Sequence, residues 1–145
     1  MNLSKNVKIS QAITNTAGAA GTAAINGITL DMANYEGVLI EVTFGAIVSG
    51  AATSIKAQQG QASNMSDAAD LLGTGQTIAD TDDEKTFFID LYRPAERYVR
   101  LVVPRATQNA TCTATYIQYM PRNAPTTHGS NVAGETHVSP AEGTA

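Results

Sequence analysis

A strict two-residue alternation of side chains between Lys85 and Val103 constrains the fold of this chain more than any other feature. Two is the side-chain period of a β-strand, so the stretch contains one strand before and one after the connection Arg93–Glu96. Pro94 ends the first strand and Pro104 ends the second, because proline cannot donate to a β-ladder. We therefore predict a hairpin at the centre of the core. Its inward-facing side chains are Phe87, Ile89, Leu91, Val99, Leu101 and Val103.

Shorter alternating segments, separated by turn-forming residues, flank this hairpin. The pair Asn26-Gly27 is a strong turn signal inside one of them, which is therefore two short strands or one bulged strand. One helical turn is expected between Ser66, as its cap, and Gly73, as its stop. About seven or eight short strands result, which predicts an all-β fold, an antiparallel β-sandwich or jelly roll. The other strand candidates are residues 7–12, 23–30, 37–44, 53–59, 77–79 and 111–119.

Composition divides the chain into three parts. Residues 1–6 form a polar N-terminal arm, residues 7–119 form the β-sandwich domain, and residues 120–145 form an extended or flexible C-terminal arm. The C-terminal arm contains three prolines and three glycines but few large apolar side chains, so it cannot fold alone. It is either a flexible end or an arm that becomes ordered against a neighbouring subunit. An extended chain covers about 3.3 Å per residue, so the arm can reach well beyond the domain.

Charge and composition exclude several classes of partner. The formal net charge is −4 and the basic residues are scattered, whereas nucleic-acid binding requires a basic stripe. No apolar run approaches the roughly 20 residues that span a bilayer, and no signal peptide is recognisable. We therefore expect a protein that is made in the cytoplasm and contacts neither nucleic acid nor membrane. The lone cysteine, Cys112, lies in an alternating run and is expected to be a small buried hydrophobe.

Candidate catalytic and metal-binding groups are few. The acidic turn 80–84 carries four carboxylates but lacks the glycine and glutamate spacing of an EF-hand loop, so a solvated turn is favoured over a calcium site. Both histidines, His128 and His137, fall in the C-terminal arm, where nothing rigid would orient an imidazole for catalysis. No nucleophile elbow, zinc-protease or Cys-x-x-Cys motif occurs. We predict a protein that is not an enzyme and needs no cofactor or metal.

Arginine and tyrosine side chains gather around the hairpin, and both residue types are favoured in protein interfaces. Ordinary surface salt bridging, which contributes little to stability, is the alternative interpretation. Arg105 belongs to the same group in the sequence, and Tyr116 and Tyr119 would add amphipathic contact area. The candidate interface residues are Arg93, Arg97, Arg100, Tyr92 and Tyr98 around the hairpin, and Met120, Pro121, Pro125, His128 and His137 in the C-terminal arm.

With these residues in view, the chain resembles the small capsid decoration, or cement, proteins of tailed bacteriophages. The resembling segments are EGVLIEVTFGAI, GAATSIKAQQ, LLGTGQTIADTDDEKTFFIDLYRPAERYVRLVVPRATQNAT and THVSPAEGTA. The resemblance implies a jelly roll or a related β-barrel without catalytic residues. It further implies a virion protein that binds the outer face of the assembled capsid as a trimer or dimer. There it would bridge neighbouring major capsid protein subunits, in part through extended termini.

Two other functions fit the same features. One is a recognition module of a tail or fibre, in which Tyr92, Tyr98, Tyr116 or Tyr119 would stack on host-surface sugars, although the chain contains no tryptophan. The other is a tail-tube or head-completion component, which should form rings. A capsid-binding assay and a glycan array separate the first alternative from capsid decoration.

Overall fold

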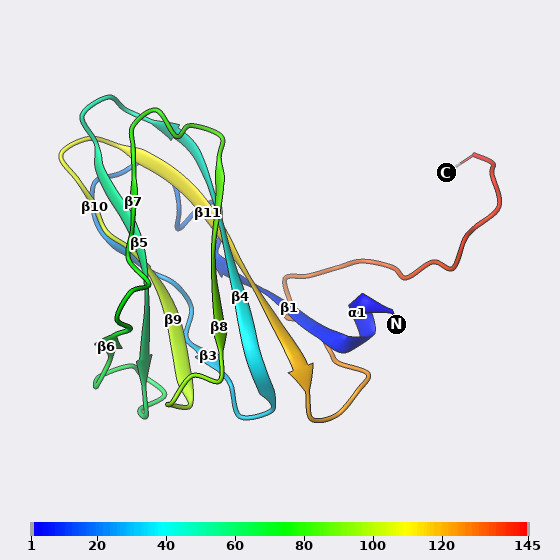
Figure 1. Ribbon diagram of the computed structural model, residues 1–145. Helices are drawn as coiled ribbons and strands as arrows, with labels where there is room; N and C mark the ends of the chain where they lie inside the picture. The colour runs from blue at the N-terminus through cyan, green and yellow to red at the C-terminus, as the bar shows by residue number, and fades with distance from the viewer. Residues whose placement is uncertain (1, 145) are drawn as a thin grey trace.

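The structure is a computed structural model that describes residues 2–144, and it consists almost entirely of antiparallel β-strands (Figure 1). The all-β class predicted from the alternation is therefore confirmed. One helical turn, α1 (Leu3–Asn6), precedes the first strand. The strands are β1 (Val7–Ile13), β2 (Ile25–Asn26), β3 (Leu30–Asp31), β4 (Tyr35–Ile47), β5 (Ala52–Gly60), β6 (Ala69–Asp70), β7 (Gln76–Ile78), β8 (Thr86–Tyr92), β9 (Tyr98–Val103), β10 (Arg105–Ala106) and β11 (Ala110–Pro121).

Two sheets stack face to face to form a sandwich (Figure 1). The first sheet has the order β1-β11-β4-β8, and the second has the order β10-β5-β9-β2, with β3 on β9 and with β6 and β7 on β5. The chain passes to the opposite sheet each time it leaves a group of strands, and the first and last strands, β1 and β11, pair with each other. This connectivity is that of a jelly roll.

The hairpin predicted at residues 85–103 is wrong in its pairing. Both strands exist where they were predicted, but β8 pairs with β4 in the first sheet and β9 pairs with β5 in the second. Alternation reports which face of a strand is buried, and it does not report which strand lies beside it. The connection through Pro94 therefore crosses between the sheets, and the two apolar rows meet across the core.

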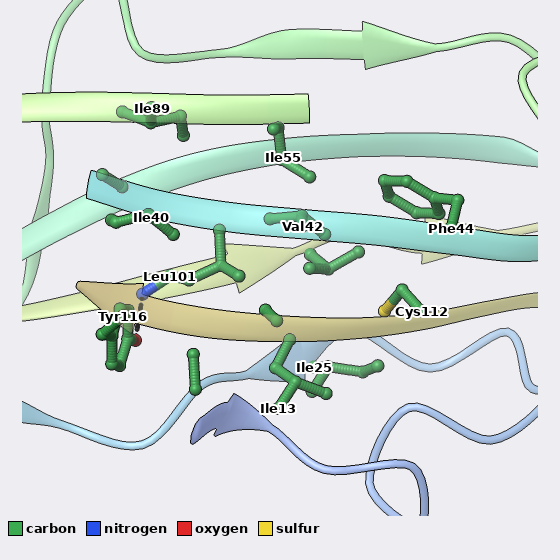
Figure 2. Close-up of a cluster of buried hydrophobic side chains, with 14 of the residues drawn as sticks. Ile13, Ile25, Ile40, Val42, Phe44, Ile55, Ile89, Leu101, Cys112 and Tyr116 are labelled. Carbon is green, nitrogen blue, oxygen red and sulfur yellow. Dashed lines mark hydrogen bonds between the residues drawn. The ribbon is translucent and has the colours of Figure 1, made fainter. Parts of the chain in front are cut away.

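The core lies between the sheets, and the alternation places its members as predicted. In β4 the side chains of Val38, Ile40, Val42 and Phe44 are fully buried. Figure 2 shows this row from the first sheet facing side chains of the second sheet, among them Ile55. Each such side chain contributes about 1.5–3 kcal/mol when it is fully buried, so the predominantly small core still holds a domain of this size.

A polar contact in the middle of the core ties the two sheets together. The backbone N–H of Leu101 in β9 donates to the hydroxyl oxygen of Tyr116 in β11 over 2.8 Å (Figure 2). Tyr116 is almost fully buried, and that burial raises the pKa of its hydroxyl. The buried position of Cys112 on the same strand confirms its prediction, and burial likewise raises the pKa of its thiol.

Two local predictions had different outcomes. The turn at Asn26-Gly27 separates two short strands, β2 and β3, both of which pair with β9. The helical turn expected after Ser66 is wrong, because this segment forms turns that lead into β6. Ala69 and Asp70 pair with Gln59 and Gln58 of β5, which keeps their backbone extended. The carboxylate of Asp67 accepts the backbone N–H groups of Gln61 and Ala62 and closes the preceding loop.

Candidate interaction surfaces

Two of the predicted interface arginines lie at the connection between β8 and β9. The Arg93 guanidinium donates to Glu36 over 2.8 Å, and Arg97 donates to both carboxylate oxygens of Asp31 over 3.0 and 2.7 Å. The hydrogen bond from Arg97 holds the pKa of Asp31 below its usual value. Each guanidinium also lies over the ring of its tyrosine neighbour, Tyr92 or Tyr98, at 5.1 and 5.2 Å. Local pairing therefore satisfies these arginines, as the salt-bridge interpretation anticipated.

A shallow depression of about 360 Å³ opens at this end of the sandwich. Its lining includes Arg93, Arg97 and Arg122 together with Glu36 and Glu96. The positive and negative side chains that line the depression nearly balance. Its electrostatic potential therefore does not favour a strongly charged ligand.

The other arginines near these strands lie elsewhere. Arg100 projects onto the outer face of the second sheet and donates to Gln58 over 2.8 Å. Arg105 is buried, and its guanidinium donates to the carbonyl oxygens of Ala19, Ala23 and Ala110. It therefore holds the loop after β1 against the domain and does not belong to a surface cluster, because Arg105 in β10 is buried like Leu101 and Val103 of β9 before it.

We name the outer surface of the second sheet the polar face, formed by Lys56, Gln58, Asp70 and Arg100. These side chains form a continuous chain of hydrogen bonds, since Asp70 accepts from Lys56 and from Gln58 over 2.7 Å each, and Gln58 accepts from Arg100. The hydrogen bond from Lys56 is the main cause of the lowered pKa of Asp70. The polar face thus satisfies its own polar groups.

The tyrosines separate into buried and exposed ones. Tyr116 lies inside the core, so the idea that it stacks on a ligand is wrong. Tyr92 is 56% exposed on β8, and Tyr98 is half-buried on β9. Tyr119 lies across the first sheet over Gly37, where an added Cβ would stand 2.2 Å from its Cζ atom. Its hydroxyl donates to Asp90 over 2.7 Å, and burial together with this carboxylate raises the pKa of Tyr119 to about 12.

The outer surface of the first sheet carries a set of large side chains that we name the aromatic face. Its members come from β4, β8 and β11 and are joined by strand register, which pairs Ile117 with Leu39, Tyr119 with Gly37 and Gly37 with Tyr92. Sequence reasoning placed Phe88 and Tyr92 on the outward side of β8 but did not connect them with the other strands. The aromatic face consists of Leu39, Phe88, Tyr92, Ile117 and Tyr119.

The C-terminal arm begins as the end of β11 and then turns back onto the domain. Pro121 pairs with Tyr35, and Met120 is exposed with a positive φ of 51°. Pro125 is exposed in the turn that follows.

The segment 126–129 then runs along the outer edge of β1. The Thr126 N–H donates to the Lys5 carbonyl over 3.0 Å, and its hydroxyl donates to the Val7 carbonyl. Ile9 donates its N–H to Nδ1 of His128 over 3.1 Å and accepts from the Gly129 N–H over 2.8 Å. We name this segment the docked strap. It covers an edge strand whose backbone groups would otherwise face solvent.

The last part of the arm contacts the domain once more, where the hydroxyls of Thr136 and Ser4 share a hydrogen bond, and its end then leaves the domain, as the red end of the chain in Figure 1 shows. His137 lies 3.2 Å from Glu135, and both side chains are well exposed. Residues 133–144 are all exposed. The predicted arm therefore has two parts, a docked strap at its root and an outlying end.

The acidic turn 80–84 uses its carboxylates as backbone acceptors. Asp80, Asp82 and Asp83 accept the N–H groups of Gly50, Ala79 and Ile47, respectively, over 2.8–2.9 Å. Within residues 2–144, no three His, Cys, Asp or Glu side chains are placed to hold a metal ion. The same part of the chain has no helix that is long and apolar enough to cross a membrane.

Comparison with known proteins supports the fold and leaves the family open. No protein-family model matches the sequence, and no curated protein matches it. Among solved structures, the chain is similar to the crystal structure of PBSX exported protein XepA, with a TM-score of 0.54 and 13% sequence identity. The match covers 96% of this chain and 45% of XepA, so the chain spans less than half the length of that protein. At this identity the similarity shows a shared fold alone.

Proposed function

We propose that this protein is a structural component of a bacteriophage virion that binds the outer surface of the capsid and bridges neighbouring major capsid protein subunits. The observation that carries the proposal is the two-part arm on a jelly roll. The docked strap 126–129 holds the root of the arm on the domain, and the exposed end 133–144 touches the domain through a hydrogen bond between Thr136 and Ser4 and then extends away from it (Figure 1). The similar fold of XepA, which is phage-related, agrees with a phage structural role.

Binding of this kind stabilises a shell by linkage. A protein that binds only the assembled lattice adds its binding free energy to that lattice. Self-association as a trimer or dimer would present several arms at once, and repeated weak contacts then combine through avidity. The protein would be made in the host cytoplasm and would act on the capsid exterior, with no catalytic group and no cofactor.

Two truncations test the role of the arm. The first ends the chain after Ser130 and keeps the docked strap, and the second ends it after Pro121 and removes the strap as well. Each is mixed with shells assembled from the major capsid protein of the same phage, and copies per shell are counted by electron microscopy. The first should lower occupancy while leaving thermal stability unchanged. The second should lower both, because it uncovers the edge of β1.

Full occupancy by the chain that ends after Ser130 would refute bridging through the outlying end. The same micrographs distinguish the ring-forming alternative, since a tail-tube or head-completion component would assemble at one vertex or into free rings. Regularly spaced copies over the shell would support the proposal.

A further inference from the structure

The aromatic face exposes large apolar side chains that lie next to one another in the strand register. Phe88 is 63% exposed and Tyr92 is 56% exposed, and both project from β8, the outermost strand of the first sheet. Leu39 and Ile117 extend the apolar surface from β8 toward the middle of the first sheet, because the register places them opposite each other on β4 and β11. Contiguous apolar surface of this kind marks interaction sites more often than single exposed residues do.

The position of Tyr119 makes the surface flat and fixed. The missing side chain at Gly37 lets the ring lie across β4, and Asp90 holds its hydroxyl over 2.7 Å. An aromatic ring held in one orientation loses little conformational entropy when a partner covers it. The aromatic face is therefore organised before any partner arrives.

The outward-facing charges of the three strands are negative, and the cation that lies over the Tyr92 ring, Arg93, is paired with Glu36. Glu41 and Asp90 are the charged side chains among the outward residues of β4, β8 and β11 within the described chain. Asp90 already accepts from Tyr119, whereas Glu41 forms no salt bridge in the described residues. Glu41 is thus a negative charge without an ion-pair partner among the described residues, so charge complementarity favours a partner that presents a basic group to it.

A shallow hollow of about 300 Å³ lies beside the free carboxylate. Its lining is Leu39, Glu41, Thr86 and Phe88. The register places Glu41 directly opposite Phe88, so an apolar group in the hollow would lie next to the carboxylate. In protein interfaces, apolar and aromatic side chains that fill pockets supply most of the binding free energy, and charged pairs beside them add specificity.

We propose that the aromatic face docks a protein segment that places an apolar side chain between Leu39 and Phe88 and directs a lysine or arginine to Glu41. The inference rests on the proposed function in one respect, that the segment belongs to the major capsid protein. The docked face then holds the domain on the shell, while the outlying end of the arm reaches the next subunit.

The test measures binding of the full-length protein to shells assembled from the major capsid protein alone. Phe88→Ser should weaken binding roughly tenfold or more, because it removes an interface anchor. Glu41→Lys should weaken it by roughly threefold to tenfold and should flatten its dependence on salt. Lys56→Glu on the polar face is the matched control and should bind like the wild type. Tyr92→Ser replaces Phe88→Ser if thermal melting shows that the latter does not fold.

The outcomes separate this inference from the proposed function. Wild-type binding with no loss in the Phe88 and Glu41 variants would overturn the inference and leave the proposed function standing. No binding by the wild type would overturn both. A dimer in sedimentation velocity that Phe88→Ser dissociates would assign the face to a second copy. Glycan-array binding abolished by Phe88→Ser would assign it to a sugar, and either result would overturn the proposal.

Discussion

The two outer faces of the sandwich differ in how their side chains are satisfied. On the polar face, Lys56, Gln58, Asp70 and Arg100 bond to one another in a continuous chain. On the aromatic face, Tyr119 donates to Asp90 and Arg93 lies over the Tyr92 ring, but Phe88 remains largely exposed and Glu41 has no ion-pair partner among the described residues. Both faces are built on the same core and by the same alternation. The contrast fits a polar face that is adapted to solvent and an aromatic face that, as we propose above, binds a partner.

A cavity in the core that the two sheets share should destabilise the whole domain, and with it both outer faces. Phe44 is fully buried and meets Phe87 edge to face with ring centroids 5.9 Å apart. Phe44→Ala should lower the free energy of unfolding by about 3–5 kcal/mol, because it removes packing and leaves a cavity. Urea denaturation measures the loss. A change below about 1 kcal/mol would mean that the two sheets do not share one core.

Removing the hydrogen bond from Leu101 to Tyr116, which joins the two sheets, should reduce stability less and leave both outer faces intact. Tyr116→Phe leaves the buried N–H of Leu101 without its acceptor, which should cost about 1–3 kcal/mol. Denaturant unfolding measures this cost, and Tyr98→Phe serves as the control on a half-buried tyrosine. An equal response of the two variants would contradict the role of the Tyr116 hydroxyl.

Displacing the Tyr119 ring should change the aromatic face without affecting the polar face. In Gly37→Ala the new Cβ would occupy the position of the Tyr119 ring, so the bond to Asp90 should break. The free energy of unfolding should fall by about 1 kcal/mol, the value of a typical hydrogen bond. Denaturant unfolding at neutral pH measures it.

The same variant carries a pH prediction with a definite sign. The pKa of Tyr119 is raised to about 12 in the folded protein, whereas tyrosine in an unfolded chain ionises near 10. Its contribution to stability is complete below pH ~10 and is lost as the pH rises toward 12. Tyr116 also ionises late because it is buried, so ultraviolet titration of tyrosinate should show more than one late-ionising group, of which one shifts to lower pH in Gly37→Ala. An unchanged titration would show that the ring does not lie over Gly37.

The smallest effect is expected on the polar face. Lys56→Ala removes one member of an exposed network, and exposed ion pairs contribute little because water screens them. Thermal unfolding at neutral pH should therefore resolve no change. The pKa of Asp70 is lowered by Lys56, so any contribution is present at neutral pH and is lost as the pH falls through that lowered pKa. A large loss of stability would mean that this face, too, is part of the structural framework.

Much of the sandwich was predictable because alternation is a local property. The rows Val38–Phe44 and Val99–Val103 are buried as their period requires, and the turns at Asn26-Gly27 and Pro94 fall where the residue types place them. The pairing of β8 and β9 was not predictable in this way, since both a hairpin and a crossing between sheets satisfy the same alternation. The helical turn predicted after Ser66 is wrong because Ala69 and Asp70 pair with β5, a contact with a segment that local residue types do not reveal.

The candidate surfaces were predictable only in part, for a related reason. Sequence proximity grouped Arg93, Arg100 and Arg105, but the fold sends them to an edge connection, an outer face and the interior. The aromatic face joins residues from three strands far apart in the chain, so no local pattern could show it. The docked strap likewise depends on which strand edge lies near the end of β11.

The sequence by itself determined the class of fold and the inward sides of β8 and β9, because the period of two acts within each strand alone. Only the tertiary structure decided which strands are neighbours, which arginine is buried, and that Tyr119 lies flat over Gly37. These features depend on contacts between distant segments, and the free energy of such contacts exists only once the two sheets have closed on each other.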